Sequence, residues 1–243
     1  MKICSLLFSS GFKISRVLKP VNKMAKIIQL DTIEDLKPQI TIAAKKLLSG
    51  GVIAVPTDTI YGIACLAQNK DAVDSIYKIK KRNPLKPIAI SIADVKDISK
   101  WCNVTVPISL LHDLLPGPVT LVFQRSQQLN EYLNPDTDYV GIRIPDHSFI
   151  RGLARTVDGP IALTSANISD QQSPLSIKEF ENLWPELDIV CDGGTLGSTV
   201  ESRQGSTVVD LSVKDCFKVL RDGSAYENTT SILKSKYQLK EIS

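Results

Sequence analysis

The sequence is poor in histidine and has no closely paired cysteines. It contains only two histidines, His112 and His147, so it offers little material for a histidine-built metal centre or a Ser-His-Asp set. The five cysteines lie far apart and form no C-x-x-C pair. This odd, scattered set argues against a disulfide framework and against a zinc site. We therefore expect no protein-ligated metal, and thiols that pack as small buried hydrophobes.

Long apolar runs and the common glycine motifs are also missing. No stretch reaches 18 consecutive apolar residues, which predicts that the chain has no transmembrane helix. There is no G-x-x-x-x-G-K-[ST] motif and no G-x-G-x-x-G motif after a strand, so the usual nucleotide cradles are absent. With 43% hydrophobic and 23% charged residues, the composition is that of a globular protein rather than a disordered, collagen-like or coiled-coil chain.

The net charge of +3 comes from the N-terminal residues. Residues 1–23 hold five basic and no acidic side chains, and the rest of the chain has a net charge of −2. On a helical wheel most apolar residues of this segment share one side and the bases another. It resembles a mitochondrial presequence, which predicts a targeting leader over residues 1–25 and a protein that is both cytoplasmic and mitochondrial, with Met24 as a cytosolic start. A solvated tail without targeting function is the alternative.

From about residue 26 the sequence alternates between helical and extended patterns. Helices are predicted over residues 33–48, 71–80, 94–101, 107–115, 148–157, 177–184 and 229–236, the first capped by Asp31 or Thr32. Strands are predicted at residues 52–55, 87–92, 119–124, 139–144, 161–164, 187–191, 206–211 and 217–221. This mixture predicts an α/β fold with one domain over residues 26–243, built on a large, mixed, twisted sheet flanked by helices. Residues 193–205 are rich in turn formers and are the expected mobile loop.

Four polar clusters lie where predicted strands or helices end. Residues 56–62 follow a strand and combine hydroxyls with a carboxylate, although a self-satisfied turn would explain them. Residues 80–86 hold four bases, which suit a helix C-terminus or converge on a triphosphate. Residues 163–169 place hydroxyl and amide groups at a sheet edge, where α/β folds bind ligands. Residues 203–210, followed by residues 220–223, again join bases and hydroxyls to strands. Each cluster alone is a weak signal.

Taken in order, the clusters resemble the YrdC family. The motifs are P-T-D-T-x-Y-G from residue 56, K-x-R from residue 80, K-P-[IL] from residue 86, G-P-V-T-L from residue 117, G-I-R-I-P from residue 141, T-S-A-N from residue 164, G-S-T-V-V-D from residue 205 and L-R-x-G from residue 220. The resemblance extends from about residue 28 to residue 237, and the ordered set is far more specific than any single motif. It implies a YrdC-like catalytic domain over residues 26–243.

Members of that family are L-threonylcarbamoyladenylate synthases, which are nucleotidyltransferases. The resemblance implies a reaction of L-threonine, bicarbonate or CO₂, and ATP with Mg²⁺ that yields threonylcarbamoyl-AMP and pyrophosphate. It also implies a partner, a tRNA threonylcarbamoyl transferase that uses the adenylate to make t6A at adenosine 37. No nucleophilic side chain is expected, because such catalysis consists largely of positioning two bound substrates.

The same resemblance assigns candidate site residues. ATP would be bound by Lys80, Arg82, Lys86, Asn167 and Arg221, with Lys80 and Arg82 as the catalytic cations on the triphosphate. Threonine would be bound by Thr59, Arg143, Ser165 and Ser206, with Arg143 pairing bidentately with its carboxylate. Ser91 stands where many family members have a histidine, so no contact is assigned to it. Residues 195–204 are longer than in compact members and are a candidate lid.

Two other functions remain open at this point. A concave basic face could bind double-stranded RNA or tRNA without catalysis, or make a weak RNA contact beside the catalytic function. The net charge of −2 outside residues 1–23 and the lack of an aromatic-basic stripe count against this alternative. A hydrolase or maturation domain is a third reading, because related domains occur within hydrogenase-maturation proteins.

Overall fold

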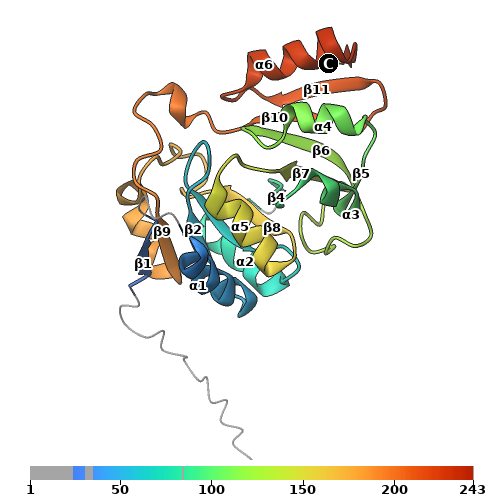
Figure 1. Cartoon of the computed structure of the whole chain (residues 1–243). Helices are drawn as coiled ribbons and strands as arrows, with labels where there is room; N and C mark the ends of the chain where they lie inside the picture. The colour runs from blue at the N-terminus through green and yellow to red at the C-terminus, as the bar shows by residue number, and fades with distance from the viewer. Residues whose placement is uncertain (1–23, 31–34, 84, 243) are drawn as a thin grey trace, which may run out of the picture.

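A computed structural model describes residues 24–30, 35–83 and 85–242 (Figure 1). Almost all of the predicted leader over residues 1–25 therefore lies outside the described residues. The predicted helix caps Asp31 and Thr32 lie outside them as well.

One mixed sheet forms the centre of the described structure. Its strands are β1 (Lys26–Gln29), β2 (Ile53–Val55), β3 (Gly62–Leu66), β4 (Ala89–Ser91), β5 (Cys102–Asn103), β6 (Val119–Arg125), β7 (Tyr139–Arg143), β8 (Ile161–Ser165), β9 (Ile189–Asp192), β10 (Thr207–Asp210), β11 (Cys216–Arg221) and β12 (Lys240–Glu241). They run in the order β1-β9-β2-β3-β8-β4-β7-β6-β10-β11-β12, with β5 beside β6. The sheet contains parallel pairs, such as β4–β7 and β6–β10, and antiparallel pairs, such as β3–β8 and β6–β7. This arrangement confirms the predicted large mixed sheet.

Helices cover the sheet. They are α1 (Lys37–Leu48), α2 (Lys70–Ile79), α3 (Ile98–Trp101), α4 (Ile108–Leu114), α5 (Ser148–Val157) and α6 (Tyr226–Ser231), the last continuing into a π-helical turn, Ile232–Lys236. The helices α1 and α5 lie side by side on one face and bury a core that includes Leu47 and Phe149 (Figure 1). A larger core includes Ile76 of α2 and Phe123 of β6. None of the helices formed by the described residues has the length and apolar character needed to cross a bilayer.

Two helix predictions need correction. The helix predicted over residues 33–48 begins only at Lys37, with Pro38 in its first turn, where proline's missing N–H costs no helical hydrogen bond. The segment Ile177–Glu186 is a 3₁₀-helix rather than an α-helix, and it is broken at Phe180. The Phe180 ring is buried and packs against the ring of Tyr61, with 5.6 Å between the ring centroids.

The sequence analysis also missed four strands. The strand β3 is buried along nearly its whole length, so its residues show no polar alternation, and small residues make it resemble a continuation of the preceding turn. The strands β5 and β12 have two residues each, too few for any periodic pattern, and β1 is a four-residue edge strand. Cys65, Cys102 and Cys191 are buried free thiols, in agreement with their expected packing role, whereas Cys216 is only partly buried and Cys4 lies outside the described residues.

Candidate functional site

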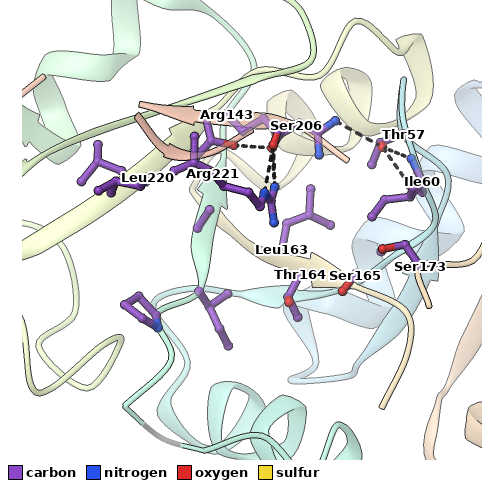
Figure 2. A pocket seen from close by; sticks show the side chains of 18 of the residues that line it. Thr57, Ile60, Arg143, Leu163, Thr164, Ser165, Ser173, Ser206, Leu220 and Arg221 are labelled. Atoms are coloured by element: carbon purple, nitrogen blue, oxygen red, sulfur yellow. Dashed lines mark hydrogen bonds between the residues drawn. The ribbon is translucent and has the colours of Figure 1, made fainter. Parts of the chain in front are cut away.

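A cavity of about 450 Å³ lies over the middle of the sheet. The residues that line it are Thr57, Ile60, Gly62, Arg82, Pro87, Ile88, Ala89, Thr120, Val122, Thr137, Tyr139, Gly141, Arg143, Leu163, Thr164, Ser165, Ser173, Gln204, Ser206, Val208, Asp210, Leu220 and Arg221. All the polar clusters found in the sequence contribute to this lining. Figure 2 shows Ser206 and Arg221 on one side of the cavity and Ser165 on the other.

Strand register explains why residues distant in sequence meet here. Thr120 of β6 is paired with Arg143 of β7 on one side and with Val208 of β10 on the other. Val208 is in turn paired with Arg221 of β11. Paired residues on neighbouring strands point to the same face of a sheet, so this row carries both arginines to the cavity.

A second set of paired residues forms the floor of the cavity, which is apolar apart from Asp210. Val122 is paired with Gly141 on one side and with Asp210 on the other, and Ala89 is paired with Leu163. A Cβ atom on Gly141 would lie 2.8 Å from Cγ2 of Thr120 and 3.2 Å from Cβ of Ala89. Because Gly141 has no side chain, the floor of the cavity can pack closely here without a clash. The cavity joins this apolar floor to a polar rim, the usual character of a small-molecule site.

Three arginines, Arg82, Arg143 and Arg221, give the cavity its positive charge. Burial lowers the pKa of the Arg221 guanidinium, and the charges of Arg143 and Arg82 lower it further. The guanidinium groups of Arg143 and Arg82 are therefore close enough to that of Arg221 to repel its charge. Since arginine stays protonated in proteins, such a group stabilises an anionic ligand.

The turn after β2 holds Arg143. Its Nη2 donates to Asp58 Oδ1 at 2.5 Å and to Thr59 Oγ1 at 2.6 Å, with Thr57 Oγ1 at 3.4 Å. These acceptors use both protons of Nη2, so a bidentate pair with a ligand carboxylate, as expected from the sequence, cannot include that nitrogen in this geometry. Nη1 donates to none of the described residues, and Nε is buried without a partner among them. Nη1 of Arg143 is therefore the NH₂ group that this geometry leaves available as a donor. Ser91, beside Arg143 in the sheet, is also buried with no described partner for its Oγ.

Ser206 links Arg221 of β11 to Thr120 of β6. The Arg221 guanidinium donates to Ser206 O at 2.7 and 3.1 Å and to Ser206 Oγ at 3.1 Å (Figure 2). Ser206 Oγ also lies 2.8 Å from Thr120 Oγ1. A Cβ atom on Gly223 would lie 2.3 Å from the backbone of Ser206, so glycine permits this close approach. The guanidinium of Arg221 is thus fixed at the cavity wall.

Residues 80–86 and 165–167, the basic and the hydrogen-bonding cluster, lie together as expected. Arg82 lines the cavity, and its guanidinium donates to Lys86 O at 3.0 Å and Pro87 O at 2.9 Å. Lys86 is exposed and forms an ion pair with Asp170 at 2.7 Å. Lys80 is fully buried, and its Nζ donates to the backbone oxygens of Ser165 and Asn167.

The predicted site residues divide into two sets. The members that line the cavity are Arg82, Arg143, Ser165, Ser206 and Arg221. The members that do not line it but contact those that do are Thr59, Lys80, Lys86 and Asn167, the last only through Lys80. Their roles toward ligands stay predictions.

Several lining residues were not singled out from the sequence. Thr57 and Gly141 lie within the quoted motifs, so a residue-by-residue reading of those motifs could have found them. Gln204 belongs to the cluster at residues 203–210, just before the motif that starts at residue 205, whereas Ser173 and Tyr139 lie outside the quoted motifs and only the fold brings them to the cavity.

The chain has close relatives among known proteins. The model of the Sua5/YciO/YrdC family, described as "Telomere recombination", matches residues 45–223. The chain belongs to this family. A mouse protein named threonylcarbamoyl-AMP synthase is 54% identical over 199 residues, which are 81% of this chain and 71% of the mouse protein. A human protein of the same name is 53% identical over 199 residues, with the same two shares.

Solved structures of the family share the fold. A crystal structure of Sua5 from Pyrococcus abyssi, complexed with L-threonine, is 28% identical and superimposes with a TM-score of 0.77. The match covers 90% of this chain and 62% of the Pyrococcus chain, so this chain spans about three fifths of that protein. The single-domain prediction for residues 26–243 is untested by this likeness.

Proposed function

We propose that this protein is a threonylcarbamoyl-AMP synthase, a nucleotidyltransferase of tRNA processing. L-threonine, bicarbonate and ATP would give threonylcarbamoyl-AMP, pyrophosphate and water. The observation that supports this most directly is the single cavity in which the motifs at residues 56–62, 80–82, 141–145, 164–167 and 205–210 meet. The names of the mouse and human relatives, at 54% and 53% identity, agree with it.

The positive side of the cavity suits a nucleoside triphosphate. The carbamate oxygen of N-carboxythreonine would attack the α-phosphate, and pyrophosphate would leave. Negative charge grows on the α-phosphate and on the leaving group, and fixed guanidinium groups stabilise such charge without reorganisation. We assign this role to Arg82 and Arg221, both on the cavity wall, with Lys86, which is exposed and accepts from Arg82 through its backbone oxygen, as a further contact.

The turn at residues 56–61 suits threonine. Arg143 would donate from Nη1 to the threonine carboxylate, while Asp58 and Thr59 hold its Nη2 in place. Ser165 and Ser206 offer hydroxyls on opposite sides of the same space (Figure 2). Holding the carbamate and the α-phosphate together makes the reaction effectively unimolecular, so no side-chain nucleophile is required.

Mg²⁺ is proposed to enter with ATP. Among the described residues, no group of three His, Cys, Asp or Glu side chains is arranged to hold a metal ion. Mg²⁺ is commonly bound by substrate phosphates, water and one or two carboxylates, and Asp210 supplies a carboxylate to the cavity wall. The ion would neutralise phosphate charge when bound.

The destination of the product and the location of the protein are also proposals. The product would pass to a tRNA threonylcarbamoyl transferase. Residues 1–25 would direct one form to mitochondria, and initiation at Met24 would give a cytoplasmic form. A fluorescent reporter fused to residues 1–30 checks the leader, since a purely diffuse signal contradicts it.

Mass spectrometry tests the reaction. Purified protein is incubated with ATP, Mg²⁺, bicarbonate and isotope-labelled threonine, and threonylcarbamoyl-AMP is expected only when all are present. Arg82→Ala should abolish threonine-dependent pyrophosphate release with the fold intact. Lys70→Ala, which removes an exposed base that does not line the cavity, is the matched control and should retain activity. No labelled adenylate from the folded wild-type protein would contradict the proposal.

A further inference from the structure

Lys80 differs from the other basic residues of its cluster because its side chain is completely buried, whereas Lys81 and Lys86 are exposed and Arg82 lines the cavity. It caps the C-terminus of α2 and is 0% exposed. Its Nζ donates to Ser165 O, and to Asn167 O at 2.6 Å, with Asn167 Oδ1 at 3.3 Å and Ser165 Oγ at 3.4 Å. An ammonium group has three protons, so these four oxygens leave none for a phosphate.

The backbone of Lys80 holds the same turn from its other end. Lys80 O accepts from the amide of Ser169 at 3.0 Å. Within the turn, Asn167 Nδ2 donates to Gln171 O at 2.5 Å. One residue therefore anchors residues 165–169 at both ends. Ser165, at the start of this turn, lines the cavity, whereas Lys80 and Asn167 do not.

We propose that Lys80 is a positioning residue, which fixes the turn 165–169 and thereby Ser165 against the bound substrates, rather than a phosphate ligand. This inference rests on the proposed function, and it reassigns the direct triphosphate contact expected for Lys80 from the sequence. Arg82, two residues later, lines the cavity and retains the phosphate role. At this helix end the K-x-R motif therefore places its lysine in the interior and its arginine at the cavity.

The charge of Lys80 fits this role. Burial lowers the pKa of Lys80 to about 7, and the charge of Arg82 adds to the shift. A phosphate ligand would lose its function when it lost its charge. A neutral amine still has two N–H donors, enough for the backbone oxygens of Ser165 and Asn167.

The first test uses ligand-free protein and so does not depend on the proposed reaction. In Lys80→Met, amide hydrogen exchange at Ser169 and Gln171 should accelerate about tenfold or more, because the turn loses its anchor. In Arg82→Ala, the matched control, exchange at these amides should stay as in the wild type. Unchanged exchange in a folded Lys80→Met protein would overturn the inference.

The second test separates a phosphate contact from a positioning role. Calorimetry measures binding of ATP and of AMP, each with Mg²⁺ and without threonine. A residue that contacts the β- and γ-phosphates should weaken ATP binding selectively, and Arg82→Ala is expected to lower ATP affinity about tenfold more than AMP affinity. Lys80→Met should weaken both by the same factor within about twofold, since both share the α-phosphate end and the turn. A selective loss of ATP affinity in Lys80→Met would overturn the inference.

A second variant covers the case in which Lys80→Met does not fold. Lys80→Arg keeps the charge and the donors but displaces them, so it should show the faster exchange at Ser169 and the same unselective loss. Selective loss of ATP affinity, or unaltered exchange, would again overturn the inference. Failure of the proposed function looks different: wild-type protein would bind neither nucleotide, while the exchange result would stand.

Discussion

Arg143 and Asp58 form an ion pair that is almost completely removed from water. Their side chains are 9% and 10% exposed, and Arg143 Nη2 lies 2.5 Å from Asp58 Oδ1. The other carboxylate oxygen, Oδ2, accepts from the amide of Asp146 at 3.0 Å. One carboxylate therefore fixes both the guanidinium at the cavity and the turn that follows β7.

Replacing this carboxylate should cost both stability and substrate binding. Asp58→Asn keeps the shape but leaves Arg143 buried without a counter-charge, which lowers the free energy of unfolding by about 3 kcal/mol. Urea denaturation measures this loss, and the KM for threonine should rise. Asp74→Asn removes a carboxylate from the exposed Lys70–Asp74 pair and should cost less than about 1 kcal/mol. Equal losses in the two variants would contradict the importance of the buried pair.

The floor of the cavity should not tolerate a side chain at Gly141. Gly141→Ala forces Thr120 or Ala89 to move, since its Cβ would lie 2.8 and 3.2 Å from their atoms. We expect a loss of about 1–3 kcal/mol from overpacking, measured by urea denaturation, and a raised KM for ATP. Gly159→Ala is the control, because its Cβ would meet nothing closer than 3.8 Å. Wild-type KM in Gly141→Ala would place the nucleotide away from this floor.

Local patterns predicted most of the elements but not their pairing. The strands β6, β7 and β10 have short apolar runs between turn formers, so their positions could be read from the sequence. That Arg143, Thr120, Val208 and Arg221 form one row depends on strand register, which no local pattern encodes. The resemblance predicted the residue types at the site. It did not predict that Asp58 and Thr59 occupy Nη2 of Arg143 and leave only Nη1 for a ligand.

Lys80 shows the same limit within one motif. A lysine two residues before an arginine predicts two bases on one ligand, because sequence alone does not reveal burial. The structure buries Lys80 under residues 165–169 and leaves Arg82 at the cavity. Burial depends on β8, which is distant in sequence, and a helix-end pattern carries no information about it.

Lys80 should also make stability depend on pH. Its pKa falls from the usual lysine range to about 7 in the folded protein, so between pH 7 and about 10.5 the unfolded chain binds more protons than the folded one. The free energy of unfolding therefore rises with pH across this window, because the unfolded chain releases a proton that the folded protein has already lost. Denaturation at several pH values measures the slope. Lys80→Met should flatten it, and an unchanged slope in that variant would assign the effect to another group.

The last prediction concerns two contacts that Arg203 makes beside the cavity. Arg203 Nη1 donates to Ser173 O at 2.8 Å and pairs with Glu179 Oε2, which ties residues 193–205 to residues 173–179. Ser173, which accepts from Arg203, and Gln204, which follows Arg203 in the chain, both line the cavity.

Arg203→Ala should therefore loosen two parts of the cavity wall without disturbing the core. The pair is partly exposed, with side chains 24% and 34% accessible, so we expect a stability loss of no more than about 1 kcal/mol. The KM for ATP should rise several-fold or more, and kcat should change little, because the wall acts on binding rather than on the reacting atoms. Arg155→Ala breaks a comparable pair with Asp94 on residues that do not line the cavity, and its KM should match the wild type. A fall in kcat at unchanged KM in Arg203→Ala would instead indicate that residues 193–205 act in the chemical step.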